Sequence, residues 1–182
     1  MKICLVGDRC GKTSIVQRWL RPSYPIERER TIAIDMKSMT LSMDGEAKSL
    51  RIWDCSGESH YRDMLDRYMF NSNLICVCYD LTSRESWHIA QYWLARIGTL
   101  IEGAIICLIG NKLDLESTRR IRLEEIQEVC DTNKYHIFHC EVSAYTGENC
   151  KDTLQMIIRE AKRDPKKYVI RTLEPEKNCI IV

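Results

Sequence analysis

The feature that most constrains the fold of this sequence is a continuous apolar run, Leu74–Tyr79, which reads Leu-Ile-Cys-Val-Cys-Tyr. An alternating pattern would indicate a strand with one wet face, whereas an uninterrupted run suits a strand that is covered on both faces. Ala104–Ile109 is a second run of this kind, and Lys2–Val6 is a shorter one. Such strands are typical of parallel sheets, whose crossover connections place helices on both faces. We therefore expect an α/β fold.

Helical patterns separate these apolar runs. Apolar residues recur at helical spacing from Lys12 to Leu20, before Pro22, and from a Thr82/Ser83 cap to about Leu100. The other expected elements are a short helix ending near Phe70, helices at Leu123–Cys130 and Cys150–Lys162, a strand at Ile137–Cys140, and strands at Thr31–Leu41 and Ala47–Trp53 joined by a hairpin at Asp44-Gly45. This alternation predicts a doubly wound, six-stranded, mostly parallel sheet with helices on both faces.

Composition limits the class of protein. The 182 residues suit one domain, and their net charge of +1 gives no sign of a nucleic-acid partner. Several of the ten cysteines lie inside apolar runs, and no Cys-x-x-Cys pair occurs. We therefore expect reduced, cytosolic thiols and no zinc site. No apolar run reaches the length of about 18 residues that a membrane-spanning helix needs.

The loop after the first strand has the layout of a phosphate-binding loop. It reads Gly7-Asp8-Arg9-Cys10-Gly11-Lys12-Thr13 and opens the first expected helix, whose N-terminus would hold phosphate oxygens. Lys12 would reach the outer phosphates, and the Thr13 hydroxyl would ligate Mg²⁺. The usual motif has about four residues between its glycines, but here there are only the three residues Asp8, Arg9 and Cys10.

Two further strand ends carry polar groups that suit a nucleotide. Asp54 could hold Mg²⁺ through water, and the Gly57 N–H could approach a γ-phosphate, although an ordinary Asp/Gly turn explains this pattern equally well. The segment Asn111-Lys112-Leu113-Asp114 is a more specific signal for a nucleotide. The Asp114 carboxylate can accept hydrogen bonds from both N1–H and the exocyclic amine of guanine. Asn111 would tie this loop to the phosphate loop, and the Lys112 stem would lie along the base. A plain polar turn is the less favoured interpretation.

Taken together, these motifs resemble the Ras-superfamily small GTPases over residues 2–163. The resemblance implies the P-loop small-GTPase fold, GTP or GDP as the bound nucleotide, and Mg²⁺ held by Thr13, Thr31 and Asp54. It also implies that Tyr24 packs on the guanine. The implied nucleotide-binding residues are Asp8, Arg9, Cys10, Gly11, Lys12, Thr13, Ser14, Tyr24, Thr31, Gly57, Asn111, Lys112, Asp114 and the third base motif Ser143, Ala144 and Tyr145, in which tyrosine replaces the family's lysine.

Within the superfamily, the sequence is most similar to the Rab branch. Thr31-Ile32-Ala33-Ile34-Asp35-Met36 resembles its Thr-Ile-Gly-Val-Asp-Phe, and Leu50-Arg51-Ile52-Trp53-Asp54 resembles its Leu-Gln-Ile-Trp-Asp. The resemblance implies an effector-binding surface formed by Ile32, Met36, Trp53 and Tyr68. For Trp53 and Tyr68, ordinary core packing is the alternative.

The departures from the family concern catalysis. The resemblance implies a catalytic set of Glu58, Gly57 and Lys12, with Glu58 in the place of the glutamine that orients the attacking water. Glutamate accepts from water but cannot donate to the γ-phosphate, so we expect slow hydrolysis. Arg9 could instead supply positive charge near that phosphate, although a solvent-facing side chain is the favoured interpretation. Cys10, beside a helix N-terminus, is either a reactive thiol or a buried one.

The end of the chain resembles a lipidation signal. Residues 164–182 are expected to form a flexible tail after a GTP-binding domain at 1–163, and Cys179-Ile180-Ile181-Val182 reads as a C-a-a-X prenylation box. An arbitrary apolar tail is the alternative. One lipid anchors a protein only marginally, so we expect reversible membrane association of a cytoplasmic protein.

The resemblance implies a monomeric GTP/GDP switch in vesicle trafficking, on the cytosolic face of an endomembrane or the plasma membrane. Its implied partners are effectors, exchange factors, GTPase-activating proteins and a prenyl-binding dissociation inhibitor. Glu58 and the short loop also allow a hydrolysis-deficient, guanine-nucleotide-binding interaction module. The single-lipid box also suits a Ras-like signalling GTPase.

Overall fold

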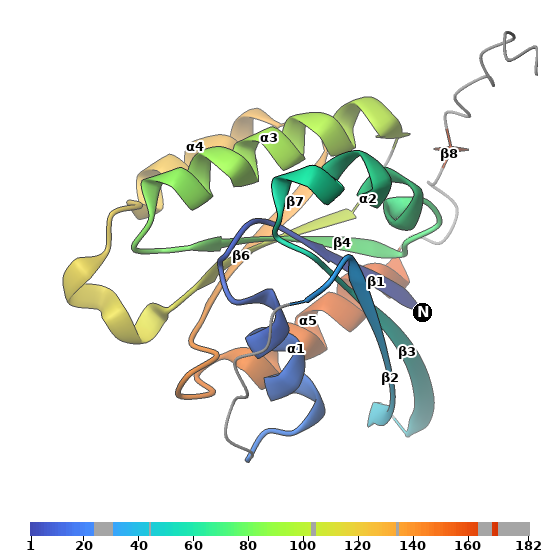
Figure 1. Cartoon of the computed structure of the whole chain (residues 1–182). Helices are drawn as coiled ribbons and strands as arrows, with labels where there is room; N and C mark the ends of the chain where they lie inside the picture. The colour runs from blue at the N-terminus through green and yellow to red at the C-terminus, as the bar shows by residue number, and fades with distance from the viewer. Residues whose placement is uncertain (24–30, 44, 103–104, 134, 164–168, 171–182) are drawn as a thin grey trace, which may run out of the picture.

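The computed structural model describes residues 1–23, 31–43, 45–102, 105–133, 135–163 and 169–170. Its centre is a six-stranded sheet with the order β2-β3-β1-β4-β6-β7, in which β2 and β3 pair antiparallel and the other neighbours pair parallel. The strands are β1 (Lys2–Val6), β2 (Ile34–Met43), β3 (Glu46–Cys55), β4 (Leu74–Asp80), β6 (Ile105–Asn111) and β7 (His136–Val142). The predicted α/β fold is therefore confirmed (Figure 1).

Helices cover both faces of this sheet. The helix α1 (Lys12–Leu20) lies with α5 (Cys150–Arg163) on one face, and the core there includes Trp19 and Ile157. The other face carries three further helices, as Figure 1 shows: α2 (Arg62–Met69), α3 (Arg84–Leu100) and α4 (Leu123–Thr132). All residues of β4 and β6 are buried, as expected for strands covered on both sides. Within the described residues, no helix has both the length and the apolar character needed to cross a membrane.

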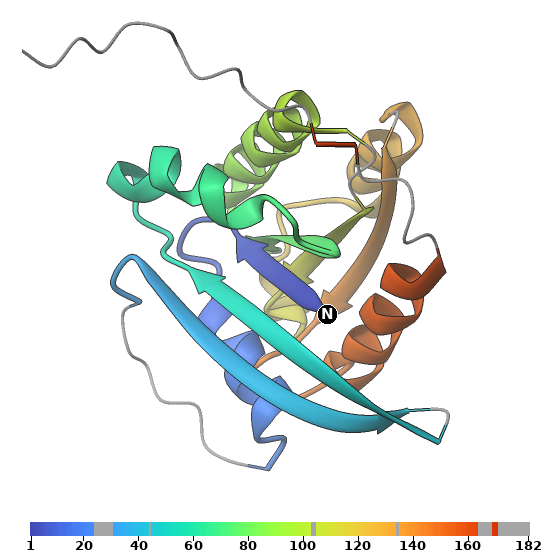
Figure 2. The same cartoon turned by 90° about the vertical axis from the view of Figure 1, so that its right-hand side faces the viewer.

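The long β2–β3 hairpin forms one edge of the sheet, as Figure 2 shows. The strand predicted to begin at Thr31 begins instead at Ile34, because Ala33 has a φ of 56° and interrupts the extended backbone. The hairpin turn predicted at Asp44-Gly45 is described only at Gly45, whose φ is 78°, and Asp44 lies outside the described residues.

Four short elements lie outside the predicted pattern. Two are 3₁₀ helices, η1 (Ser59–Tyr61) before α2 and η2 (Leu113–Thr118) in the loop after β6. The other two are β5 (Ile101–Glu102) and β8 (Val169–Ile170), which pair antiparallel in a small separate sheet. The pairing brings two residues from the expected tail back to the C-terminal end of α3.

Candidate functional site

The phosphate loop joins β1 to α1 and depends on two glycines in left-handed or unusual backbone conformations. Gly7 has a φ of 131°, and a Cβ at this position would lie 2.1 Å from the carbonyl oxygen of Cys78. Gly11 has a φ of 86°, and a Cβ there would lie 2.6 Å from the Asn111 amide nitrogen. Both positions therefore require glycine. The ammonium group of Lys12 is buried inside the loop and donates to the Gly7 carbonyl at 2.5 Å.

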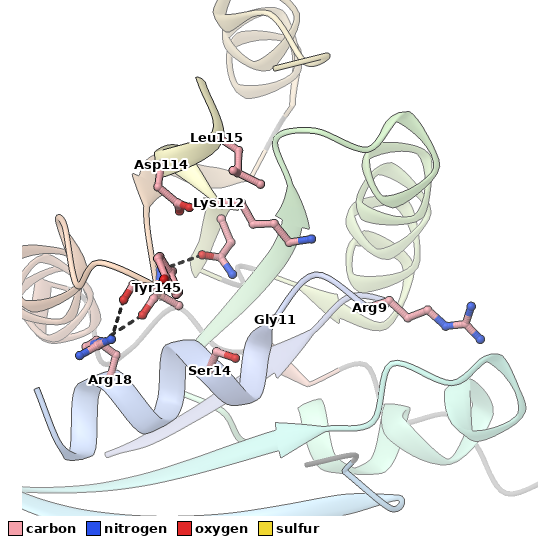
Figure 3. Close-up of a pocket in the computed structure, with 10 residues that line it drawn as sticks. Arg9, Gly11, Ser14, Arg18, Lys112, Asp114, Leu115 and Tyr145 are labelled. Atoms are coloured by element: carbon pink, nitrogen blue, oxygen red, sulfur yellow. Dashed lines mark hydrogen bonds between the residues drawn. The ribbon is translucent and has the colours of Figure 1, made fainter. Parts of the chain in front are cut away.

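The residues between the glycines take different roles in this short loop. Asp8 forms an ion pair with Arg62 at the start of α2. Arg9 has a φ of 47°, and its exposed side chain extends away from Asp114 and Tyr145 in Figure 3. Cys10 is fully buried, and burial raises the pKa of its thiol. The reactive-thiol hypothesis for Cys10 is therefore wrong, and its buried alternative holds.

Three side-chain oxygens meet beside the loop. The hydroxyl of Thr13 donates to Asp54 Oδ2 at 2.6 Å, Thr31 donates to the same oxygen at 3.3 Å, and the two hydroxyls lie 2.8 Å apart. Asp54 is only 2% exposed, and burial raises the pKa of its carboxyl group, although hydrogen bonds from Thr13 and the charge of Lys12 oppose that shift. Its second oxygen, Oδ1, is buried and has no hydrogen-bond partner within the described part of the chain. These hard oxygen groups, with one carboxylate oxygen unsatisfied, fit a Mg²⁺ ion.

The segment after β3 lies directly against the phosphate loop. A Cβ built on Gly57 would lie 2.8 Å from the Arg9 amide nitrogen and 3.1 Å from Lys12 Nζ, so only glycine permits this close approach. Next to it, a hollow of about 270 Å³ opens between this segment and α3, and Glu58 is one of its lining residues. Glu58 Oε2 lies 3.6 Å from His60 Nδ1. The structure thus places Glu58 at the junction of the phosphate loop and the segment before α2.

The base-side pocket has a volume of about 810 Å³ and lies between α1 and the loops after β6 and β7 (Figure 3). Asn111 donates to the Cys10 carbonyl at 2.8 Å and accepts from the Ala144 N–H at 3.0 Å, so it ties three loops together. Lys112 has a φ of 69° and pairs with Asp80 at 2.5 Å. The pocket is lined by Arg9, Gly11, Ser14, Arg18, Asn111, Lys112, Asp114, Leu115, Ala144 and Tyr145.

The Asp114 carboxylate is held by the loop after β7. Ser143 is fully buried, and its hydroxyl donates to Asp114 Oδ1 while accepting from the Thr146 N–H at 3.0 Å. Tyr145 is 74% exposed and lies on the rim of the pocket. The predicted base residues therefore come together around one pocket, adjacent to the phosphate loop.

Some predicted site residues stand elsewhere. Ile32 and Met36 are exposed on the segment before and in β2, and the half-buried rings of Trp53 and Tyr68 lie 5.5 Å apart. Tyr24 and Cys179 lie outside the described residues.

Arg18 also lines the pocket, although it belongs to none of the sequence motifs that predict the site. Its spacing from Ser14, four residues along the same helix, places both on one face and was the available signal.

Comparison with known proteins agrees with this arrangement. The sequence model of the Ras family matches residues 2–163. The chain is 31% identical to the human Ras-related protein Rab-30 over 172 residues, covering 90% of this chain and 82% of that protein. It is 30% identical to the GTP-binding protein YPT1 of Saccharomyces cerevisiae, covering 88% and 78%. It is also 30% identical to the Ras-related protein RABA4d of Arabidopsis thaliana, covering 89% and 73%.

Proposed function

The chain belongs to the Ras family of small GTPases, with Rab-like relatives, and we propose that it is a slowly hydrolysing, membrane-associated GTP/GDP switch in vesicle trafficking. The observation that carries the proposal is the continuity between the Asp114 pocket and the phosphate loop. Asn111 bonds directly to that loop, so a base held by Asp114 would have its phosphates beside Lys12 and Thr13. The guanine specificity follows from the acceptor-only carboxylate.

On this proposal, Mg²⁺ would be held by Thr13 and Thr31, with Asp54 acting through water. When bound, the ion would neutralise charge on the outer phosphates. Lys12, buried and held by the Gly7 carbonyl, would turn its ammonium toward the same phosphates. The Gly57 N–H, on a backbone that touches the loop, would sense the γ-phosphate.

Slow hydrolysis follows from the side chain at position 58. Glu58 would accept a hydrogen bond from the attacking water, but its negative charge would face the γ-phosphate. The shortened loop leaves Asp8 engaged with Arg62 and has no glycine between Gly7 and Gly11 to admit an activator's arginine. These two features also support the alternative function, a guanine-nucleotide-binding interaction module with very little turnover.

The proposed switch would act on partners and membranes through two separate regions. Effectors would contact the exposed Ile32 and Met36 and the neighbouring rings of Trp53 and Tyr68. Residues 1–163 would form the GTP-binding domain, and 164–182 a tail lipidated at Cys179 and carried by a prenyl-binding dissociation inhibitor.

Competition binding tests this function directly. Fluorescent GDP bound to the purified chain in Mg²⁺ should be displaced by unlabelled GDP or GTP and not by ADP or ATP at about a hundredfold excess. An Asp114→Ala variant should lose most of this preference, because the guanine N1–H and amine would have no acceptor. Equal displacement by adenine nucleotides from the wild type would contradict the proposed function.

A further inference from the structure

Arg18 is the one charged side chain of α1 that lies in the base pocket without being a family motif residue, and its contacts are specific. Its Nε donates to the Ala144 carbonyl at 3.0 Å, and Nη2 donates to the Tyr145 carbonyl at 2.8 Å. Its Nη1 donates to the Pro22 carbonyl at 2.6 Å. Figure 3 shows the guanidinium below the loop that carries Tyr145, with the two contacts to that loop drawn as dashed lines.

Holding these carbonyls fixes the direction of the peptide groups that follow them. A trans peptide carries its C=O and N–H on opposite sides, and the described residues contain no cis peptide bond. With the Tyr145 carbonyl facing Arg18, the Thr146 N–H must face the other way. It does so, and donates to Ser143 Oγ at 3.0 Å.

The relay ends on the carboxylate that would read the base. Ser143 Oγ receives its hydrogen bond from Thr146 and therefore turns its own proton toward Asp114 Oδ1. A continuous chain of contacts thus runs from the Arg18 guanidinium, through the Tyr145 peptide and the Ser143 hydroxyl, to Asp114. Because the orientation of each polar group depends on the one before it, loss of the first member loosens the last.

We propose that Arg18 is a positioning residue for guanine specificity, acting through the Tyr145–Thr146 peptide and Ser143 on Asp114. The inference rests on the proposed function, because it assigns a role within the same nucleotide site. The contact with Pro22 adds a second consequence. Arg18 joins the loop after β7 to the segment that follows α1, so a conformational change at Pro22 would alter the position of that loop.

Inosine diphosphate provides the discriminating ligand, because it has the N1–H of guanine but lacks the exocyclic amine. A correctly aimed Asp114 accepts two hydrogen bonds from GDP and one from inosine diphosphate, so its position sets the ratio of their affinities. Dissociation of ribose-labelled fluorescent GDP and inosine diphosphate should therefore be measured for the wild type, Arg18→Met, Arg18→Lys and the control Arg159→Gln. Arg159 is exposed on α5.

Arg18→Met should speed GDP release by about tenfold and release of inosine diphosphate by clearly less. The ratio of the release rate of inosine diphosphate to that of GDP should therefore fall by about threefold or more. Arg18→Lys keeps the charge but cannot span both loop carbonyls with a fork of donors, so it should change the ratio in the same direction. It also carries the test if Arg18→Met does not fold. Arg159→Gln should match the wild type.

Four outcomes would overturn the inference. Equal acceleration of both nucleotides would show that Arg18 only supports the fold, and a wild-type ratio in Arg18→Lys would show that its charge alone matters. Unchanged release from both Arg18 variants, in a wild type that prefers GDP, would contradict the inference and leave the proposed function standing. A wild type that binds neither nucleotide would contradict the proposed function and the inference with it.

Discussion

Asp8 in the phosphate loop is ion-paired with Arg62, the first residue of α2. The side chains are 11% and 25% exposed, so the contact is well shielded from water. The Arg62 guanidinium also lies 5.3 Å from the centre of the Tyr92 ring on α3. One arginine therefore connects the phosphate loop, the segment after β3 and the neighbouring helix.

The first prediction is that this ion pair couples the two segments energetically. A double-mutant cycle with Asp8→Asn and Arg62→Gln, from urea unfolding in saturating GDP, should give a coupling free energy of about 1 kcal/mol. The same cycle on Lys37 and Asp35, which are both 47% exposed and 2.8 Å apart, should give a value near zero. If the effects of Asp8→Asn and Arg62→Gln on the free energy of unfolding are additive, the ion pair does not couple the two segments.

The second prediction concerns Glu58. Glu58→Gln should raise the single-turnover rate of GTP hydrolysis by about tenfold or more, because the amide removes a charge facing the γ-phosphate and adds a donor. Glu85→Gln is the matched control, because Glu85 lines the same hollow. A wild type that already hydrolyses as fast as Glu58→Gln would contradict the explanation given for slow turnover.

Arg9→Gly separates the two hypotheses for Arg9 in the same assay. Arg9 lines the rim of both the base pocket and the hollow beside Glu58, but its side chain is exposed, so its removal should change the single-turnover rate by less than about threefold. A fall of about tenfold or more would show that Arg9 supplies the charge that an activator's arginine normally provides.

The third prediction is a pH dependence of stability that comes from His139. This side chain is only 15% exposed and lies against Tyr79, with Tyr79 Oη 2.9 Å from His139 Nε2, and burial lowers the pKa of His139 from 6.5 to about 4. As the pH falls from 6.5 to about 4, His139 therefore binds a proton in the unfolded chain but not in the folded chain. The contribution of His139 is complete above this range and is lost within it, by about 3 kcal/mol.

Unfolding free energies between pH 7 and pH 4, in saturating GDP, check this prediction. Across this pH range, the free energy of unfolding of the wild type should fall by about 3 kcal/mol more than that of His139→Gln. His88→Gln, at an exposed position of α3, should follow the wild type. Parallel curves for His139→Gln and the wild type would show that His139 does not resist protonation in the folded chain.

The fourth prediction tests the lipid anchor. In cells, Cys179→Ser should move the protein from the membrane fraction to the supernatant, because the sulfur of the C-a-a-X cysteine carries the prenyl group. Cys130→Ser, at a half-buried thiol of α4, is the control and should leave the distribution unchanged. An unchanged membrane fraction in Cys179→Ser would contradict the anchor.

The sheet could be predicted because its signals are local. Leu74–Tyr79 and Lys12–Leu20 each carry a complete pattern of apolar residues, and the structure places β4 and α1 where those patterns lie. The predicted start of β2 was wrong by a few residues. The strand is interrupted at Ala33 by a left-handed backbone conformation, which an alanine in the sequence does not indicate. Short elements such as η2 and the β5–β8 pair depend on tertiary contacts and leave no periodic signal.

The candidate site was predictable where a residue type alone implies chemistry. Thr13, Asp54 and Asp114 have side chains whose oxygens suit a metal or a base, and the sheet brings their loops to one edge. Arg18 could not be recognised in the same way, because its role arises from backbone carbonyls far away in the sequence. The choice between a reactive and a buried Cys10 also required the packing of the loop.

The central claim is that this chain holds a guanine nucleotide with Mg²⁺ between its phosphate loop and Asp114. The most direct measurement is mass analysis of the small molecules and metal released when the purified protein is denatured. We predict GDP or GTP and Mg²⁺, each close to one per chain, and loss of the nucleotide on prolonged chelation of the metal. Absence of any guanine nucleotide, even after incubation with GDP and Mg²⁺, would contradict the account.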